Sequence, residues 1–208
     1  MGERTSFQPL TKEDKITVIL YRVGILLSTL TVCVSAVLAL QSAFGAGLQE
    51  HPFIVSGLGM GILLLVLYFS VGMSVFFIHL YVGKFYRILK QLYYAAALCL
   101  VVLFLLGHGN PAAPLFAPRP IGGLLLFPLS LCLGFVTAKE AFCFRLLEGY
   151  ILALAMPAYV FFYSLGAWDQ KGSAAGLSLI AILLLLFMLR KIFMPIAYDI
   201  GDKSAYQP

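Results

Sequence analysis

Charged residues are scarce in this chain of 208 residues. Asp, Glu, Lys and Arg make up 11% of it, whereas hydrophobic residues make up 62%. A water-soluble domain carries about 25% charged residues. The chain therefore has too little polar surface to cover a globule in water. This excludes the soluble classes of protein and predicts that lipid is the solvent.

Recognisable catalytic motifs are missing as well. The sequence has no HExxH zinc motif, no GxSxG nucleophile turn, no Walker phosphate loop, no histidine box and no CxxC pair. Its four cysteines suggest neither a disulfide framework nor a zinc site. Few acidic residues fall inside apolar stretches, so little is available to build a proton or ion path. We expect a protein that is not an enzyme and predict no cofactor, while a bound lipid or pigment stays open.

Six apolar stretches are present, and each is long enough to cross a bilayer or nearly so. We predict an all-α, polytopic integral membrane protein whose six transmembrane helices form one bundle. Residues 16–194 form this transmembrane domain, between an N-terminal tail (1–15) and a C-terminal tail (195–208). The expected spans are about 17–40, 53–82, 92–107, 121 to beyond 138, 150–168 and 174–193.

Lysine and arginine alternate between the gaps that separate these stretches. Of the 14 basic residues, only Arg119 and Lys171 lie in the gaps that follow the first, third and fifth stretches. The other twelve lie in the tails, in the gaps after the second and fourth stretches, or at the adjoining ends of the stretches. Basic segments stay on the cytoplasmic side of a membrane, so both termini are predicted to be cytoplasmic. The same asymmetry explains the net charge of +5 without nucleic acid. The expected partners are membrane lipids and other integral membrane subunits, and no nucleic acid.

The segment KEAFCFRLLEGY (139–150) is the densest functional candidate. Lys139 and Glu140 fall within the last turns of the fourth span if its helix continues to Phe144, and ionisable groups at such a depth usually find partners. One interpretation is an interfacial turn whose charges set the topology. The other is a buried polar cluster that joins Glu140 to Arg22 or Arg87, with Arg145 paired to Glu148. The candidate cluster comprises Lys139, Glu140, Cys143, Arg145 and Glu148.

Two weaker candidates lie on other segments. Gly57 and Gly61 form a small-xxx-small pair, which lets two helices approach closely. We expect this face to pack within the bundle, or else against a partner subunit. His51 and His108 both fall on the non-cytoplasmic side and are weak candidates for a metal site, although no metal is predicted from their spacing.

The phrase AKEAFCFR (138–145), followed by Glu148 and the apolar segment with Pro157, resembles a family of uncharacterised integral membrane proteins typical of cyanobacteria. The similarity covers most of the chain, and the KEAFCF phrase is its most specific part. The family carries a domain of unknown function without established active-site residues, so none is transferred. The resemblance implies a thylakoid or plasma membrane in a photosynthetic prokaryote.

Two functions are compatible with this pattern. The first is a non-enzymatic accessory protein that assembles or stabilises a photosynthetic membrane complex such as a photosystem. The alternative is a small-solute transporter or channel, which a water-filled cavity reaching Glu140 would favour. An intramembrane enzyme using Cys143 or the histidines is the weakest hypothesis, because a reactive thiol needs a lowered pKa as well as exposure.

Overall fold

The computed structural model describes residues 10–45, 57–80, 82–117 and 120–200. Six helical segments within these ranges are long and apolar enough to cross a membrane, so the predicted six-span, all-α architecture is confirmed. They are α1 (Lys12–Phe44), α3 (Leu58–Phe77), α4 (Gly83–Leu106), the 3₁₀ segment η2 (Ile121–Leu126) continued by α6 (Phe127–Phe144), α7 (Leu147–Ser164) and α8 (Gln170–Ile192). Two single-turn helices are also present, α5 (Ala112–Leu115) and α9 (Ala197–Ile200).

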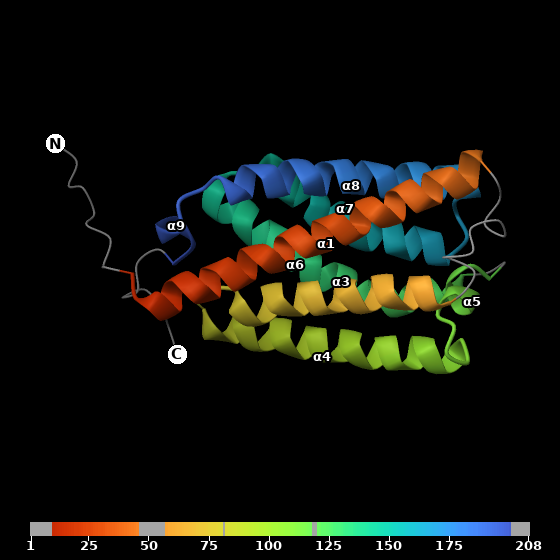
Figure 1. Ribbon diagram of the computed structural model, residues 1–208, viewed down its shortest axis with the longest axis horizontal. Coiled ribbons are helices and arrows are strands. Elements are labelled where there is room, and N and C mark those ends of the chain that lie inside the picture. The colour runs from red at the N-terminus through yellow and green to blue at the C-terminus, as the bar shows by residue number, and fades with distance from the viewer. Residues whose placement is uncertain (1–9, 46–56, 81, 118–119, 201–208) are drawn as a thin grey trace.

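The helices form one elongated bundle (Figure 1). α1 crosses the bundle obliquely and packs against α3 on one side and α8 on the other. α6 packs against α7 and α4, which closes the bundle behind α1. α4 lies at the margin and has the smallest buried share of the six spans. Most of its side chains therefore face lipid in a membrane.

Several helix boundaries differ from the predicted spans because polar capping residues extend or end the helices. α1 begins at Lys12 rather than near residue 17, since Thr11 and Asp14 form a capping box. The Thr11 backbone N–H donates to the Asp14 carboxylate over 2.8 Å, and the Asp14 N–H donates to the Thr11 hydroxyl over 3.2 Å. With 33 residues, α1 is about 50 Å long and exceeds the ≈30 Å hydrocarbon core.

Two other helices also begin earlier than predicted, α4 without a side-chain cap and α8 with one. α4 includes the polar stretch 83–91, so the third span is a full 24-residue helix instead of a short one. α8 begins at Gln170, where Asp169 caps it by accepting from the Gly172 N–H over 2.8 Å. The proline-rich stretch 111–120 holds a single helical turn, α5.

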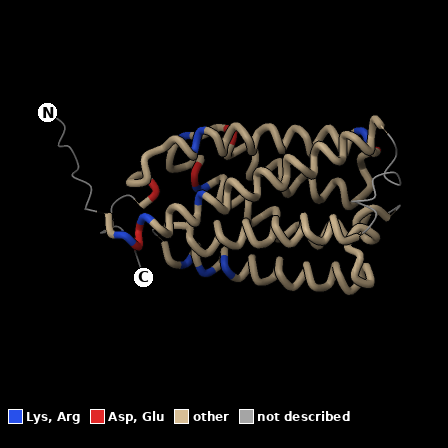
Figure 2. Tube along the Cα trace, in the orientation of Figure 1, with Lys and Arg blue, Asp and Glu red and all other residues tan. Residues whose placement is uncertain are grey.

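Charge is distributed unequally between the two ends of the bundle (Figure 2). Within the described ranges, every Lys and Arg except Lys171 lies toward one end, which we call the basic end. It holds the start of α1, the start of α4 and the ends of α6 and α8. The alternation along the sequence thus becomes an asymmetry in space. That the basic end is cytoplasmic remains a prediction from the charge rule.

Candidate functional site

Glu140 is buried in the last turn of α6, near the basic end. Its side chain is fully shielded from solvent. Glu140 Oε1 accepts hydrogen bonds from the Tyr21 hydroxyl and from Lys139 Nζ, each over 2.7 Å. Its Oε2 forms an ion pair with Lys191 Nζ of α8. One carboxylate therefore connects α1, α6 and α8.

Lys191 extends this arrangement to the C-terminal helix α9. Its ammonium group also pairs with Asp199, a buried residue of α9. Asp199 Oδ2 in turn accepts from Arg22 Nε over 2.7 Å and lies 2.7 Å from Arg22 Nη2. Arg22 Nη1 donates to the carbonyl of Met194 over 2.6 Å. We call this set the ionic network: Tyr21, Arg22, Lys139, Glu140, Lys191 and Asp199.

Every charged group of the ionic network has an oppositely charged partner within the network. Two carboxylates, Glu140 and Asp199, face three cations that all lie in contact with them. The Lys191 ammonium additionally stands 4.1 Å from the centre of the Phe144 ring. Charges removed from water are stabilised only when partners surround them, and removal of one partner leaves a costly unpaired group. The network therefore fixes the mutual positions of four helices.

Of the five residues predicted for a buried polar cluster, only Lys139 and Glu140 belong to the ionic network, and the partners of Glu140 differ from those expected. Glu140 contacts Lys191 rather than Arg87, and Arg22 joins indirectly through Asp199. The expected pairing of Arg145 with Glu148 is wrong. α6 ends at Phe144, Arg145 adopts the left-handed conformation with φ 55°, and the chain turns before α7.

Glu148, at the start of α7, instead pairs with Arg190 of α8 over 2.8 Å. It does not share a continuous helical face with Glu140, because two different helices carry the two residues. Cys143 is exposed on the surface of α6 and is a free thiol. These three sequence candidates, Cys143, Arg145 and Glu148, surround the ionic network without belonging to it.

The two glycines predicted for helix packing differ in role. Gly57 precedes α3 with φ +63°, and a Cβ there would lie 2.6 Å from the Asn110 side chain. Gly61 faces Phe104 of α4 at an ordinary contact distance of 3.5 Å. A close helix approach occurs at Gly24 of α1, where a Cβ would lie 2.6 Å from the Ser70 carbonyl oxygen of α3. Sequence reasoning missed this position, although Gly24 and Ser28 form a small-xxx-small pair on α1.

Only one member of the proposed histidine pair lies in the described ranges, so the pair stays a prediction. His51 lies outside them, and His108 occupies the turn after α4 with φ 48°. No group of three or more His, Cys, Asp or Glu side chains suited to a metal ion occurs among the described residues.

A second feature lies in the half of the bundle away from the basic end. A cavity of about 490 Å³ opens between α1, α3, η2, α6, α7 and α8. This volume is within the ≈300–1,000 Å³ typical of ligand sites. Of the described residues that line it, none is charged. Its apolar wall includes Leu38, Met60, Leu64, Leu126, Leu133 and Ile180.

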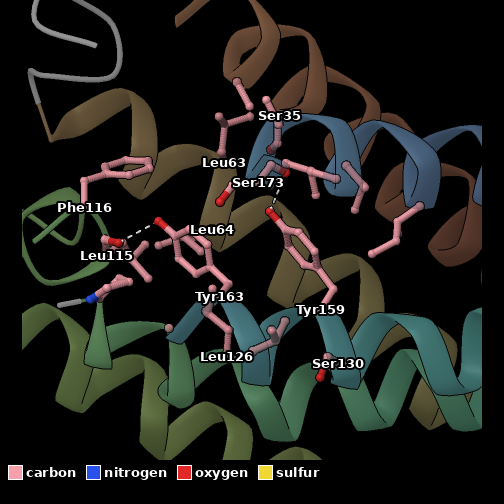
Figure 3. A pocket seen from close by; sticks show the side chains of 18 of the residues that line it. Ser35, Leu63, Leu64, Leu115, Phe116, Leu126, Ser130, Tyr159, Tyr163 and Ser173 are labelled. Atoms are coloured by element: carbon pink, nitrogen blue, oxygen red, sulfur yellow. Dashed lines mark hydrogen bonds between the residues drawn. The ribbon is translucent and has the colours of Figure 1, made fainter. Parts of the chain in front are cut away.

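A few polar side chains interrupt this apolar wall. Tyr159 and Tyr163 of α7 extend side by side into the cavity (Figure 3). Their rings are nearly parallel, with centres 6.1 Å apart. Both hydroxyls bond to backbone carbonyls, Tyr159 to Ser173 over 2.9 Å and Tyr163 to Leu115 over 2.8 Å. These bonds hold the rings in one orientation against the cavity.

The cavity and the ionic network are separate. The cavity reaches Leu133 on α6 and Ile180 on α8, and Glu140 is not among its lining residues. Between the two levels, buried side chains of one hydrophobic core, including Val136 and Leu184, fill the bundle. The chemistry available in the cavity is therefore the binding of an apolar molecule, without a nearby charge.

Comparison with known proteins agrees with this architecture. Residues 73–207 match the model of an uncharacterized integral membrane protein family, DUF2301. The chain belongs to this family. The match covers more than half of the chain, including the Glu140–Lys191–Asp199 part of the ionic network and the α7 tyrosines. No curated protein and no solved structure matches the chain.

Proposed function

We propose that this membrane protein is a non-enzymatic accessory protein that holds a lipid-soluble molecule in the cavity beside Tyr159 and Tyr163. The observation that supports this proposal is the cavity itself, whose described lining is apolar, uncharged and large enough for a small lipid. Sites of this kind bury most of an apolar ligand and orient it through a few polar groups. The two fixed tyrosines are such groups.

Membership in DUF2301 supports the membrane setting and leaves the ligand open. In the photosynthetic membranes that the sequence resemblance implies, the protein would deliver or retain a lipid-soluble component during the assembly of a complex. Co-purification from gently solubilised membranes tests that role. Enrichment of photosystem subunits supports it, whereas recovery of the chain alone under the same conditions contradicts it.

The binding function has a separate test. Ala39 of α1 lines the cavity, so Ala39→Phe places a ring in that space. Ala95→Phe makes the same change on the exposed surface of α4 and serves as the control. Lipids retained by purified protein would be extracted and identified by mass spectrometry. We expect one stoichiometric species in the wild type and in Ala95→Phe that is lost in Ala39→Phe. Identical extracts from all three proteins would refute the proposal.

Transport of a small polar or ionic solute is the second candidate. The ionic network supports it, because ionisable groups buried in a membrane protein commonly mark a solute path. Against it, the cavity does not extend to Glu140, which is shielded from solvent. Uptake assays in proteoliposomes decide between the two. Solute flux that is abolished by Glu140→Gln would favour transport.

A further inference from the structure

The polar atoms of the cavity differ in what they can still offer a ligand. The hydroxyl hydrogens of Tyr159 and Tyr163 are already donated to backbone carbonyls. Ser35 and Ser130, which also line the cavity, donate to the carbonyls of Thr31 and Phe127 within their own helices, over 2.9 and 2.7 Å. A hydroxyl that has donated its hydrogen keeps its acceptor lone pairs. These side chains therefore present acceptors to the cavity.

Donors are fewer among the described residues that line the cavity, and those of Gln170 and Trp168 lie at its rim. The Gln170 side chain is exposed, and its amide already donates to the Ser42 carbonyl over 2.9 Å. The Trp168 indole N–H belongs to a residue that is 44% exposed. The hydroxyl of Ser173, whose carbonyl accepts from Tyr159, can donate or accept. Deeper in the cavity, beside the tyrosines, acceptors predominate.

A ligand must complement this pattern, because an unmatched polar group in an apolar site is costly. A carboxylate or phosphate would bring more lone pairs to a wall without a cation among its described residues. A ketone or ester would bring acceptors alone. An alcohol brings one donor and no charge, so a single hydroxyl can bond to a tyrosine oxygen while its hydrocarbon chain contacts the leucines.

From this pattern we infer that the cavity selects an uncharged lipid with a free hydroxyl group, such as a long-chain or polyisoprenoid alcohol. The hydroxyl donates to the oxygen of Tyr159 or Tyr163. This inference rests on the proposed binding function and adds the chemical class of the ligand. Sites that hydrogen-bond a ligand hydroxyl discriminate against the analogue that lacks it.

The sequence supplies a reporter for this inference. Trp168 is the single tryptophan of the chain and lines the cavity. Bromine atoms quench tryptophan fluorescence at short range, so a brominated probe that enters the cavity reduces the signal. Three probes share one chain: 9,10-dibromostearyl alcohol, its methyl ether and 9,10-dibromostearic acid. The full-length protein, stripped of lipid in mild detergent, would be titrated with each at pH 8.

We expect the alcohol to bind about five- to tenfold more tightly than the ether, the gain typical of one hydrogen bond, and the acid to bind no better than the ether. In the double variant Tyr159→Phe, Tyr163→Phe, the ratio of alcohol to ether affinity should fall to about one. Tyr94→Phe is the matched control, since Tyr94 is an exposed residue of α4. It should leave the ratio unchanged, and circular dichroism checks that all variants are folded.

Partition of the probes into detergent is measured separately. The variant Trp168→Phe, Phe193→Trp moves the tryptophan to the residue that follows α8, which is 83% exposed. Quenching of this variant reports partition alone and normalises the three titrations. Equal affinities for alcohol and ether would overturn the hydroxyl inference and leave the binding function standing. A preference for the acid, or a ratio preserved in the double variant, would also overturn it. Quenching by none of the probes would refute the binding function itself.

Discussion

The two halves of this bundle use polar side chains in opposite ways. At the basic end, polar groups bond to each other, and Glu140, Lys191 and Asp199 leave no room for a ligand. In the other half, polar groups bond to backbone carbonyls and leave a space of about 490 Å³ beside Tyr159 and Tyr163. The charged half therefore positions the helices, while the uncharged half has the capacity to bind. Burial of ionisable groups alone does not identify the functional site.

Lys191→Met should produce the largest effect on stability. It removes the cation between Glu140 and Asp199, and the loss of one partner from a buried ion pair costs about 3–5 kcal/mol. The measurement is the free energy of unfolding in mixed SDS micelles.

The neighbouring substitution Arg190→Met is the control for this prediction. Arg190 is an exposed partner of Glu148, and such pairs contribute about 0–1 kcal/mol. Equal destabilisation by both substitutions would show that the ionic network has no special role in holding the bundle together.

A larger side chain should be tolerated in the half that holds the cavity and should destabilise the half that holds the ionic network. Ala141→Phe inserts a ring next to Glu140, where Ala141 is fully buried, and overpacking typically costs about 1–3 kcal/mol. Ala39→Phe inserts the same ring into the cavity and should be neutral or stabilise by up to about 2 kcal/mol, as cavity-filling changes do. Thermal unfolding in one detergent compares the pair. If Ala39→Phe is the more damaging change, the cavity is not available space.

Helix packing at Gly24 should be nearly as sensitive. A Cβ at Gly24 would meet the Ser70 carbonyl oxygen at 2.6 Å, whereas one at Gly61 meets Phe104 at 3.5 Å. Gly24→Ala should therefore destabilise by about 1–2 kcal/mol, and Gly61→Ala should change stability by less than about 0.5 kcal/mol. The same SDS titration measures both, and a reversed order would contradict the close approach of α1 and α3.

The smallest expected effect concerns the turn between α6 and α7. Arg145 has φ 55°, a conformation that glycine adopts without steric cost. Arg145→Gly should stabilise the chain by up to about 1 kcal/mol, a shift visible in thermal unfolding. A clear loss of stability would indicate that the Arg145 side chain makes a contact that outweighs the backbone strain.

The sequence was sufficient for the topology because hydropathy and charge act along the chain. Six spans and the common end of the basic residues follow from local composition. Glu140 could be predicted as a buried candidate for the same reason, because the number of residues between it and the start of the fourth span gives its depth in the membrane. Its partners Tyr21 and Lys191 come from two other helices, and Lys191 joins it to Asp199 of a third. Local spacing does not predict which of these side chains meet.

The cavity could not be predicted for a related reason. It is a property of packing between several helices, and its leucines look the same in the sequence as the leucines that face lipid. Tyr159 and Tyr163 could have been noticed as hydroxyl groups four residues apart on one helical face in an otherwise apolar span. The direction of their hydrogen bonds depends on Ser173 and Leu115, which the spacing does not specify.

An experimental density map of the full chain, purified in lipid nanodiscs without delipidation, tests the central comparison most directly. We predict elongated non-protein density in the cavity, with one end beside Tyr159 or Tyr163, and none next to Glu140. A closed cavity without density, or a row of ordered water molecules that reaches Glu140, would contradict the division between a binding half and a structural half.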